Sequence, residues 1–286
     1  MKILIQNYST PFSTEPLYLM ECLKTVGVDA SLWVNNESPA FDVFDAFNPD
    51  VFVGHFAFLT EDILKYLSQN PNIKSIINVT GTNSSQLENI KQTFMSMGVS
   101  MPTFTTGDFH GEHGDSVEKM LPCYDVFIKS ASPQYNMPLA VLTNNKDDTV
   151  DEFIEGKEVY HLVSYGENKE WSDYTSDVRS FWGVCDCYDE VTLIDDGLVS
   201  MSQFFFQATM LCKNFNISCQ TEEQKEAFSK MLSDLFEPEE TSEKVESVVK
   251  NQIIKNHTCF NRASKLMSIL GEEEKSQELL KAIKNE

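Results

Sequence analysis

The stretch "KILIQNYSTPFSTEPLYLMECLKTVGVDASLWVN", residues 2–35, decides the fold class. It opens with the apolar run "KILIQNY", continues with "STEPLYLMECLKTVG", whose apolar residues recur at helical spacing, and closes on "DASLWVN". The first and last runs have the length and composition of strands, and Gly27 is a typical helix end. Strand, helix and strand in this order predict a parallel βαβ unit.

The same alternation continues to about residue 100. It predicts a strand over 49–58, a helix over 59–71, a strand over 73–81 and a helix over 84–99 that ends at Gly98. Next, "PTFTTGDFHGEHGDS" indicates a loop over 102–116, and "YDVFIKSAS" (124–132) and "MPLAVLTNN" (137–145) indicate further strands. We therefore expect a Rossmann-like half with helices on both faces of a parallel sheet.

The second half is also α/β. Strands are expected over 157–166, 189–197 and 215–220, helices over 200–214 and 221–236, and further helices from 242 to the C-terminus. A chain of 286 residues exceeds the usual size of a single core, and the acidic stretch 144–158 is the best linker. We therefore predict two domains, residues 1–145 and 146–286, with C-terminal helices in the second.

The composition is that of a globular protein with an acidic surface. Hydrophobic residues make up 41%, and 44 Asp and Glu against 22 Lys and Arg give a formal net charge of -22. A protein with this negative charge repels a phosphate backbone, so direct nucleic-acid binding is disfavoured. No apolar run approaches the ~20 residues of a membrane span. Without a signal peptide, we expect a cytoplasmic protein whose seven cysteines are reduced.

The loop "GDFHGEHGD", residues 107–115, is the strongest candidate for metal binding. Its Asp108, His110, Glu112, His113 and Asp115 are residue types that divalent metals use. However, the two histidines are three residues apart in a glycine-rich segment, without the helix face that orients an HExxH pair. We therefore expect an exposed or substrate-lining loop and no metal site.

Several common signatures are missing from the chain: GxGxxG, GxxxxGK[ST], GxSxG and HExxH. Their absence disfavours the standard dinucleotide oxidoreductases, P-loop NTPases, α/β-hydrolases and zincins. A ligand is then expected at the carboxyl ends of the parallel strands, where doubly wound sheets place their sites. Polar residues follow three of these strands: Ser9, Thr10 and Ser13; His55; and Gly166 and Asn168.

His55 has two possible roles. A crevice histidine whose pKa is near neutrality can act as a general base. A histidine between apolar strand residues can equally be a hydrogen-bonded core group. The sequence leaves both alternatives open.

The segment "NHTCFNRASKLMSIL", residues 256–270, resembles the H-T-Y-x-x-R motif near the end of spore-maturation-type glycosyltransferases. His257, Thr258 and Arg262 match this motif, while Cys259 occupies the place of its aromatic residue. Upstream, "SQFFFQATMLCKNFNISC" is similar to the family's R-x-F-E-A-x-A-x-G segment. The resemblance implies the GT-B architecture, in which two Rossmann-like domains face a cleft, here with a helical C-terminal tail.

The resemblance also implies a metal-independent transfer of a sugar from a nucleotide-sugar donor to an unidentified acceptor, without a bound cofactor. The N-terminal half would hold the acceptor, with His55 or Asp108 as the catalytic base if the reaction inverts at the anomeric carbon. The donor would lie mostly on the second half. Its contacts would come from Gly166, Arg179, Gln203, Gln207, His257 and Arg262.

The chain departs from the family pattern at one important position. Gln207 stands where the family has a glutamate that contacts the donor, and glutamine forms hydrogen bonds but supplies no charge. Arg179 and Arg262 are the only arginines, although a leaving diphosphate needs cationic or amide donors. The alternative is a non-catalytic binding or regulatory module that keeps the fold.

Overall fold

The computed structural model describes most of the chain. The described residues are 1–8, 14–33, 38–107, 116–129, 136–143, 148–164, 171–194, 198–219, 221–236 and 245–283.

Two compact units make up the chain. The first unit comprises Met1–Tyr8, Glu15–Leu121 and Arg262–Glu286, and the second comprises Ser9–Thr14 and Pro122–Asn261. This division differs from the expected one between residues 1–145 and 146–286. The strand before residue 145 belongs to the second unit because it pairs with later strands. Residues 262–286 belong to the first unit because their helices contact it, as described below.

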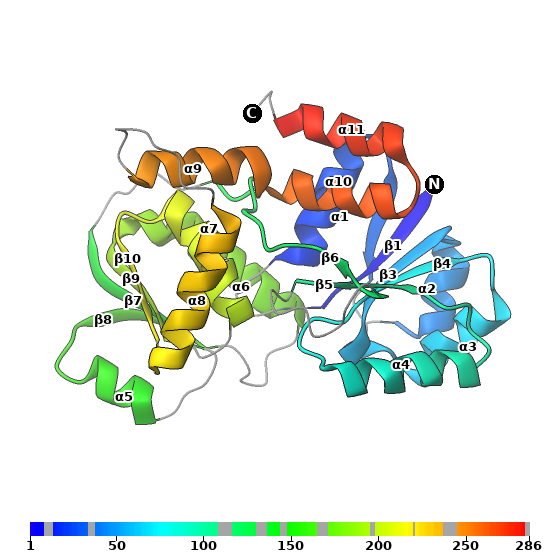
Figure 1. Cartoon of the computed structure of the whole chain (residues 1–286), viewed down its shortest axis with the longest axis horizontal. Coiled ribbons are helices and arrows are strands. Elements are labelled where there is room, and N and C mark those ends of the chain that lie inside the picture. Colours follow the sequence, from blue (N-terminus) through cyan, green and yellow to red (C-terminus); the bar gives the residue numbers. More distant parts are fainter. Residues whose placement is uncertain are drawn as a thin grey trace. The chain divides into compact units, whose positions relative to one another are not determined.

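The first unit is built on a six-stranded parallel sheet (Figure 1). The strand order is β2-β1-β3-β4-β5-β6, which is the doubly wound order in which the first strand lies between the second and the third. All of the recorded pairings in it are parallel. The strands are β1 (Lys2–Gln6), β2 (Asp29–Trp33), β3 (Val51–His55), β4 (Lys74–Asn78), β5 (Thr103–Thr106) and β6 (Glu118–Lys119).

Helices cover both faces of this sheet (Figure 1). One face packs large apolar side chains of the strands, such as Phe52 and Phe104, against α2, α3 and α4, while α1, α10 and α11 lie on the other face. The helices are α1 (Glu15–Thr25), α2 (Ala40–Phe47), α3 (Glu61–Gln69), α4 (Ser84–Ser96), α10 (Cys259–Ile269) and α11 (Glu273–Ala282), with the short 3-10 helix η1 (Phe56–Phe58).

Local signals explain where these helices begin and end. Thr60 caps α3, and Asn83 forms a capping box with Gln86 at the start of α4. Gly27 and Gly98 have positive φ values of 72° and 70° just after α1 and α4. Glycine reaches this conformation at little cost, so both predicted helix ends are confirmed.

The second unit repeats the same strand order on a four-stranded parallel sheet. Its order is β10-β9-β7-β8, so its first strand in the chain, β7, again lies between the second and the third. The strands are β7 (Met137–Thr143), β8 (Val159–Ser164), β9 (Tyr188–Ile194) and β10 (Phe215–Ser218). The helices are α5 (Asp148–Ile154), α6 (Trp171–Val184), α7 (Leu198–Leu211), α8 (Glu222–Leu235) and α9 (Val245–Asn256), with the 3-10 helix η3 (Cys185–Cys187).

The α/β class and most predicted elements are confirmed, three local interpretations are wrong, and two helices were missed. Residues 124–129 contain a single bridge and a turn instead of a strand, because Asp125 accepts the Phe127 N–H in a tight turn. Part of the expected 102–116 loop is β5, and part of the expected linker is α5. Helices α2 and α6 were not predicted, because aromatic-rich helical segments have only weak intrinsic propensity.

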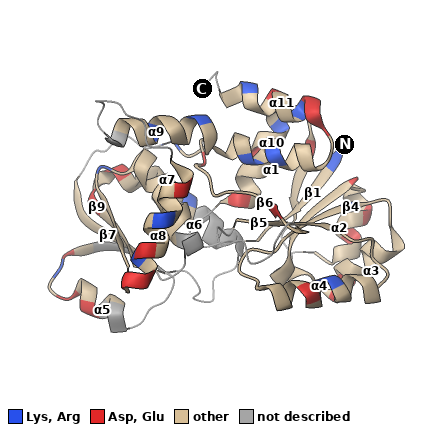
Figure 2. Cartoon of the chain, in the orientation of Figure 1, with Lys and Arg blue, Asp and Glu red and all other residues tan. Residues whose placement is uncertain are grey.

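Lysines lie among acidic residues on the exposed helices α8 and α11 (Figure 2). In α8, for example, Lys225 follows Glu222 at i+3 and its Nζ lies 3.6 Å from Glu222 Oε1. Such interspersed charge gives these two helices no basic stripe for a phosphate backbone.

Gly54 and Gly183 should respond oppositely to alanine. A Cβ on Gly54 in β3 would lie 2.7 Å from Cε1 and 2.8 Å from Cζ of the buried Phe52 ring. We expect Gly54→Ala to cost about 1–3 kcal/mol through this overlap. On Gly183 in α6, the nearest atom is Lys129 O at 3.7 Å. Gly183→Ala should therefore gain about 0.5–1 kcal/mol of helix stability.

Thermal unfolding followed by circular dichroism measures both changes. Gly183→Ala is the matched control, because it adds the same methyl group. Equal melting temperatures for wild type and Gly54→Ala would contradict the predicted overlap in β3.

Candidate functional site

Buried polar residues gather in the first unit where its parallel strands end. Tyr8 follows β1, His55 and Asn78 end β3 and β4, and Thr106 ends β5; all four are buried. The carboxyl ends of parallel strands lie at one edge of a sheet, and doubly wound proteins place ligands there. This edge is therefore the candidate site of the first unit.

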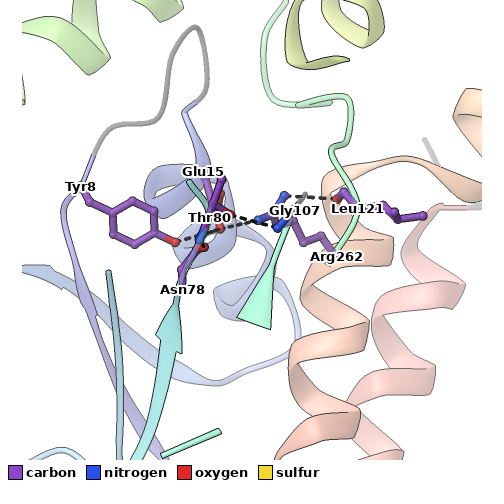
Figure 3. Close-up of polar contacts among 7 residues, drawn as sticks. All are labelled: Tyr8, Glu15, Asn78, Thr80, Gly107, Leu121 and Arg262. Carbon is purple, nitrogen blue, oxygen red and sulfur yellow. Dashed lines mark hydrogen bonds and ion pairs between the residues drawn. The ribbon is translucent and has the colours of Figure 1, made fainter. Parts of the chain in front are cut away.

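A buried carboxylate is the centre of this site (Figure 3). Oε1 of Glu15, the first residue of α1, accepts hydrogen bonds from Tyr8 Oη at 2.8 Å, Arg262 Nη2 at 2.7 Å and Asn78 Nδ2 at 3.4 Å. The other terminal nitrogen of Arg262, Nη1, donates to the carbonyl of Leu121 at 3.1 Å. We call Tyr8, Glu15, Asn78 and Arg262 the Glu15 cluster.

Burial sets the electrostatics of the Glu15 cluster. The side chains of Glu15 and Arg262 are each only 3% exposed, so their ion pair is almost dry. Burial, reinforced by the Glu15 carboxylate, raises the pKa of the Tyr8 hydroxyl well above its usual value. Tyr8 is therefore a neutral donor, and one negative and one positive charge face each other inside the unit.

Further hydrogen bonds connect the cluster to the ends of β4 and β5 (Figure 3). Asn78 Oδ1 accepts the Thr80 N–H at 2.9 Å, and Thr80 Oγ1 accepts the Gly107 N–H at 3.0 Å. Asn78 therefore donates to Glu15 with its amide nitrogen and accepts with its oxygen, which fixes the orientation of its side chain.

His55 lies beside this cluster. Its ring centroid is 5.1 Å from that of Tyr8, and the rings of Phe56 and Phe58 lie within 5.6 Å. His55 Nδ1 accepts the Ala57 N–H at 3.2 Å. The His55 N–H in turn donates to Gln6 Oε1 at 3.0 Å.

Burial lowers the pKa of His55 to about 4, so its imidazole is neutral at pH 7. A neutral imidazole has one donor and one acceptor nitrogen, and here Nδ1 is the acceptor. The proton then resides on Nε2, and the only basic nitrogen already accepts a backbone hydrogen bond. This arrangement favours the core or donor role of His55 over that of a general base.

In the second unit, three predicted donor contacts lie on or near α7. Gln203 and Gln207 occupy successive turns of α7, and each is 3% exposed. The His257 ring lies 5.2 Å from Phe206 and 5.7 Å from Phe236, and burial lowers its pKa, an effect that the Leu235 backbone partly offsets. Within the described part of the chain, neither Gln207 Oε1 nor His257 Nδ1 has a hydrogen-bond partner.

Arg179, on α6, faces a carboxylate in the second unit. Its Nη2 lies 3.6 Å from Asp125 Oδ2, and Asp125 is fully buried. The same oxygen accepts the Thr14 hydroxyl at 2.5 Å. Each of the two arginines of the chain is therefore paired with a buried carboxylate.

The structure separates the predicted site residues into groups. His55 and Arg262 belong to the first unit, where Tyr8 and Glu15 connect them. Arg179, Gln203, Gln207 and His257 belong to the second unit. The remaining predicted positions lie outside the described residues: Ser9, Thr10, Ser13, Asp108, His110, Glu112, His113, Asp115, Gly166, Asn168.

Sequence reasoning missed Tyr8, Glu15 and Asn78. Glu15 is an acidic residue in the first helical turn, a position that usually reflects the helix dipole alone. The one useful signal was the excess of acidic residues, 44 Asp and Glu, which makes a carboxylate partner for Arg262 expected but does not mark Glu15 as that partner.

No known protein-family model and no curated protein matches this chain. Among the described residues, no group of three or more His, Cys, Asp or Glu side chains could hold a metal ion. No helix in the described ranges combines the length and apolarity required to cross a membrane.

Replacing His55 should change how stability depends on pH. Since its folded-state pKa of about 4 is below the ordinary 6.5, the unfolded chain binds more protons between these values. The contribution of neutral His55 to the free energy of unfolding is thus fully present above pH 6.5. It is lost as the pH falls towards 4, and the loss is at most about 3 kcal/mol. We expect His55→Gln to lose this component, because glutamine does not titrate.

Urea unfolding of wild type and His55→Gln at pH 7.5, 6 and 5 measures this effect. The contribution of the carboxylates is common to both proteins and cancels in the difference. A difference in unfolding free energy that stays constant over this range would contradict the buried, neutral His55.

Proposed function

We propose that this chain is a glycosyltransferase of the GT-B type, which binds a nucleotide sugar and transfers the sugar to an acceptor. Its two units, each with a parallel sheet of the same doubly wound strand order, support this proposal. Each such unit offers a binding edge at the carboxyl ends of its strands. The resemblance of residues 256–270 to the glycosyltransferase motif supports it independently.

The proposed donor site is based on the buried side-chain oxygen of Gln207. Its Oε1 is buried and has no hydrogen-bond partner among the described residues, which costs about 1–3 kcal/mol. A hydroxyl of the ribose or of the sugar would supply the missing donor. Gln207 also occupies the position at which the resembled family contacts its nucleotide-sugar donor.

Gln203 and His257 complete the described part of this donor side. Gln203 precedes Gln207 by one helical turn, and His257 contacts Phe206, the neighbour of Gln207 in α7. The neutral amides suit hydroxyl groups, whereas diphosphate oxygens require cations or backbone N–H groups. We keep Gly166 and Arg179 as further donor-side candidates.

The acceptor would bind at the carboxyl edge of the first sheet, beside His55 and the segment that contains Asp108. His55 holds a proton on Nε2 and so would donate a hydrogen bond to an acceptor oxygen. Asp108 then remains the candidate for the base that deprotonates the acceptor hydroxyl. No metal enters this proposal, since side chains and backbone N–H groups would stabilise the leaving diphosphate.

The two arginine ion pairs favour a second candidate, a non-catalytic binding or regulatory module. Glu15 neutralises Arg262 and Asp125 faces Arg179, so each guanidinium already has a carboxylate partner. With glutamine in place of the donor acid, the site would keep recognition by hydrogen bonds but have little charge for stabilising a leaving group.

A thermal-shift panel of UDP-, GDP-, ADP- and CMP-sugars tests donor binding. A ligand that binds only the folded state stabilises it by about 2.7 kcal/mol at a hundredfold excess over its Kd. We expect one nucleotide class to raise the melting temperature and Gln207→Ala to abolish the rise. Gln224→Ala, in the capping box of α8, is the matched control and should keep the response.

Measuring hydrolysis of the stabilising donor separates the two candidates. Turnover supports the transferase, whereas stabilisation without turnover supports the binding module. The absence of both stabilisation and turnover across the panel would exclude a nucleotide-sugar function.

A further inference from the structure

The backbone passes between the two units at four places. It leaves the first unit after Tyr8, returns at Glu15, leaves again after Leu121 and returns at Arg262. These four residues are far apart in sequence, but hydrogen bonds join all of them. Tyr8 and Arg262 donate to the same oxygen of Glu15, and Arg262 also donates to the Leu121 carbonyl (Figure 3).

We propose that these contacts form a junction clamp, a conformational device within the first unit. The clamp fixes the positions, relative to one another, of the four residues at which the backbone leaves or enters this unit. In this role Arg262 is a positioning residue. The inference depends only on contacts within the first unit and is independent of the enzymatic proposal.

The chemistry of the clamp suits this role. An arginine fork reaches two acceptors in different directions, here Glu15 Oε1 and Leu121 O, whereas a lysine is a single point charge. Burial excludes the water that would otherwise compete for Glu15, so separating the pair would leave two buried charges that no longer neutralise each other. The pair is therefore held closed more firmly than an exposed ion pair.

The clamp also anchors the C-terminal helices. The unit boundary between Asn261 and Arg262 lies inside α10, so Arg262 is the first residue of that helix in the first unit. The Ser264 and Ser276 hydroxyls, 2.8 Å apart, join α10 to α11, and α11 contacts α1. Two further polar contacts hold this segment: Lys265 with Glu118, which is about half exposed, and Lys74 Nζ with Leu270 O at 3.4 Å.

Native-state hydrogen exchange of the full chain tests the clamp. In Arg262→Lys, we expect amides of α10, α11 and the first turns of α1 to exchange at least about tenfold faster than in wild type. Amides of β1, β3 and β4 report the global stability of the first unit and should change by less than about threefold. Glu15→Gln should give the same pattern, because it removes the negative charge that faces Arg262 Nη2 at 2.7 Å.

Lys265→Met is the matched control. It removes an ion pair of 2.9 Å one turn further along the same helix, but this pair is exposed and should leave exchange nearly unchanged. If the sheet amides accelerate as much as α10 and α11, the ion pair only stabilises the unit as a whole and the clamp is excluded. Exchange in Arg262→Lys no faster than in Lys265→Met would also exclude it.

Tyr8→Phe provides a milder test should both charge variants fail to fold. It removes one hydroxyl from the cluster and keeps the ring against His55. The clamp predicts faster exchange confined to the start of α1 and to α10. Equal acceleration throughout the first unit, or none at all, would contradict it.

Discussion

A nearly dry ion pair between residues 15 and 262 is the constraint on which the first unit depends. Taking a carboxylate and a guanidinium out of water is expensive, and their mutual attraction offsets this cost only when the geometry is close and other donors satisfy the remaining oxygen lone pairs. Here the separation is 2.7 Å, and Tyr8 and Asn78 provide such donors. The ion pair therefore ties the position of α10 to that of the first turn of α1.

Local patterns predicted the fold well, because strand and helix periodicity and glycine caps act over a few residues. Gly27 and Gly98 end helices as expected, and the alternation of strands and helices predicted the parallel pairing that both sheets have. Segments governed by long-range packing were predicted less well. Residues 124–129 have strand-like composition, but Asp125 bonds instead to Phe127 and to Thr14, more than a hundred residues away.

The candidate site shows the same contrast. Arg262 was singled out by its motif and its rarity, and it is indeed a key residue, but its partner is 247 positions away. No spacing rule connects the two, because their contact depends on the completed tertiary fold. His55 was recognised as a titratable group at a strand end, while its low pKa and its acceptor nitrogen depend on burial and on the Ala57 N–H, which only the structure reveals.

The boundary between the two units falls inside α10, and this has a consequence for how the chain can be divided. A fragment ending near residue 145 would contain Glu15, Tyr8 and Asn78 without the guanidinium that neutralises the buried carboxylate. The complementary fragment would carry that arginine on α10 without Glu15 and without α1, which α11 contacts. A cut near residue 145 would also separate β7 from β8 and β9, its neighbours in the second sheet, so neither unit would be complete in either fragment.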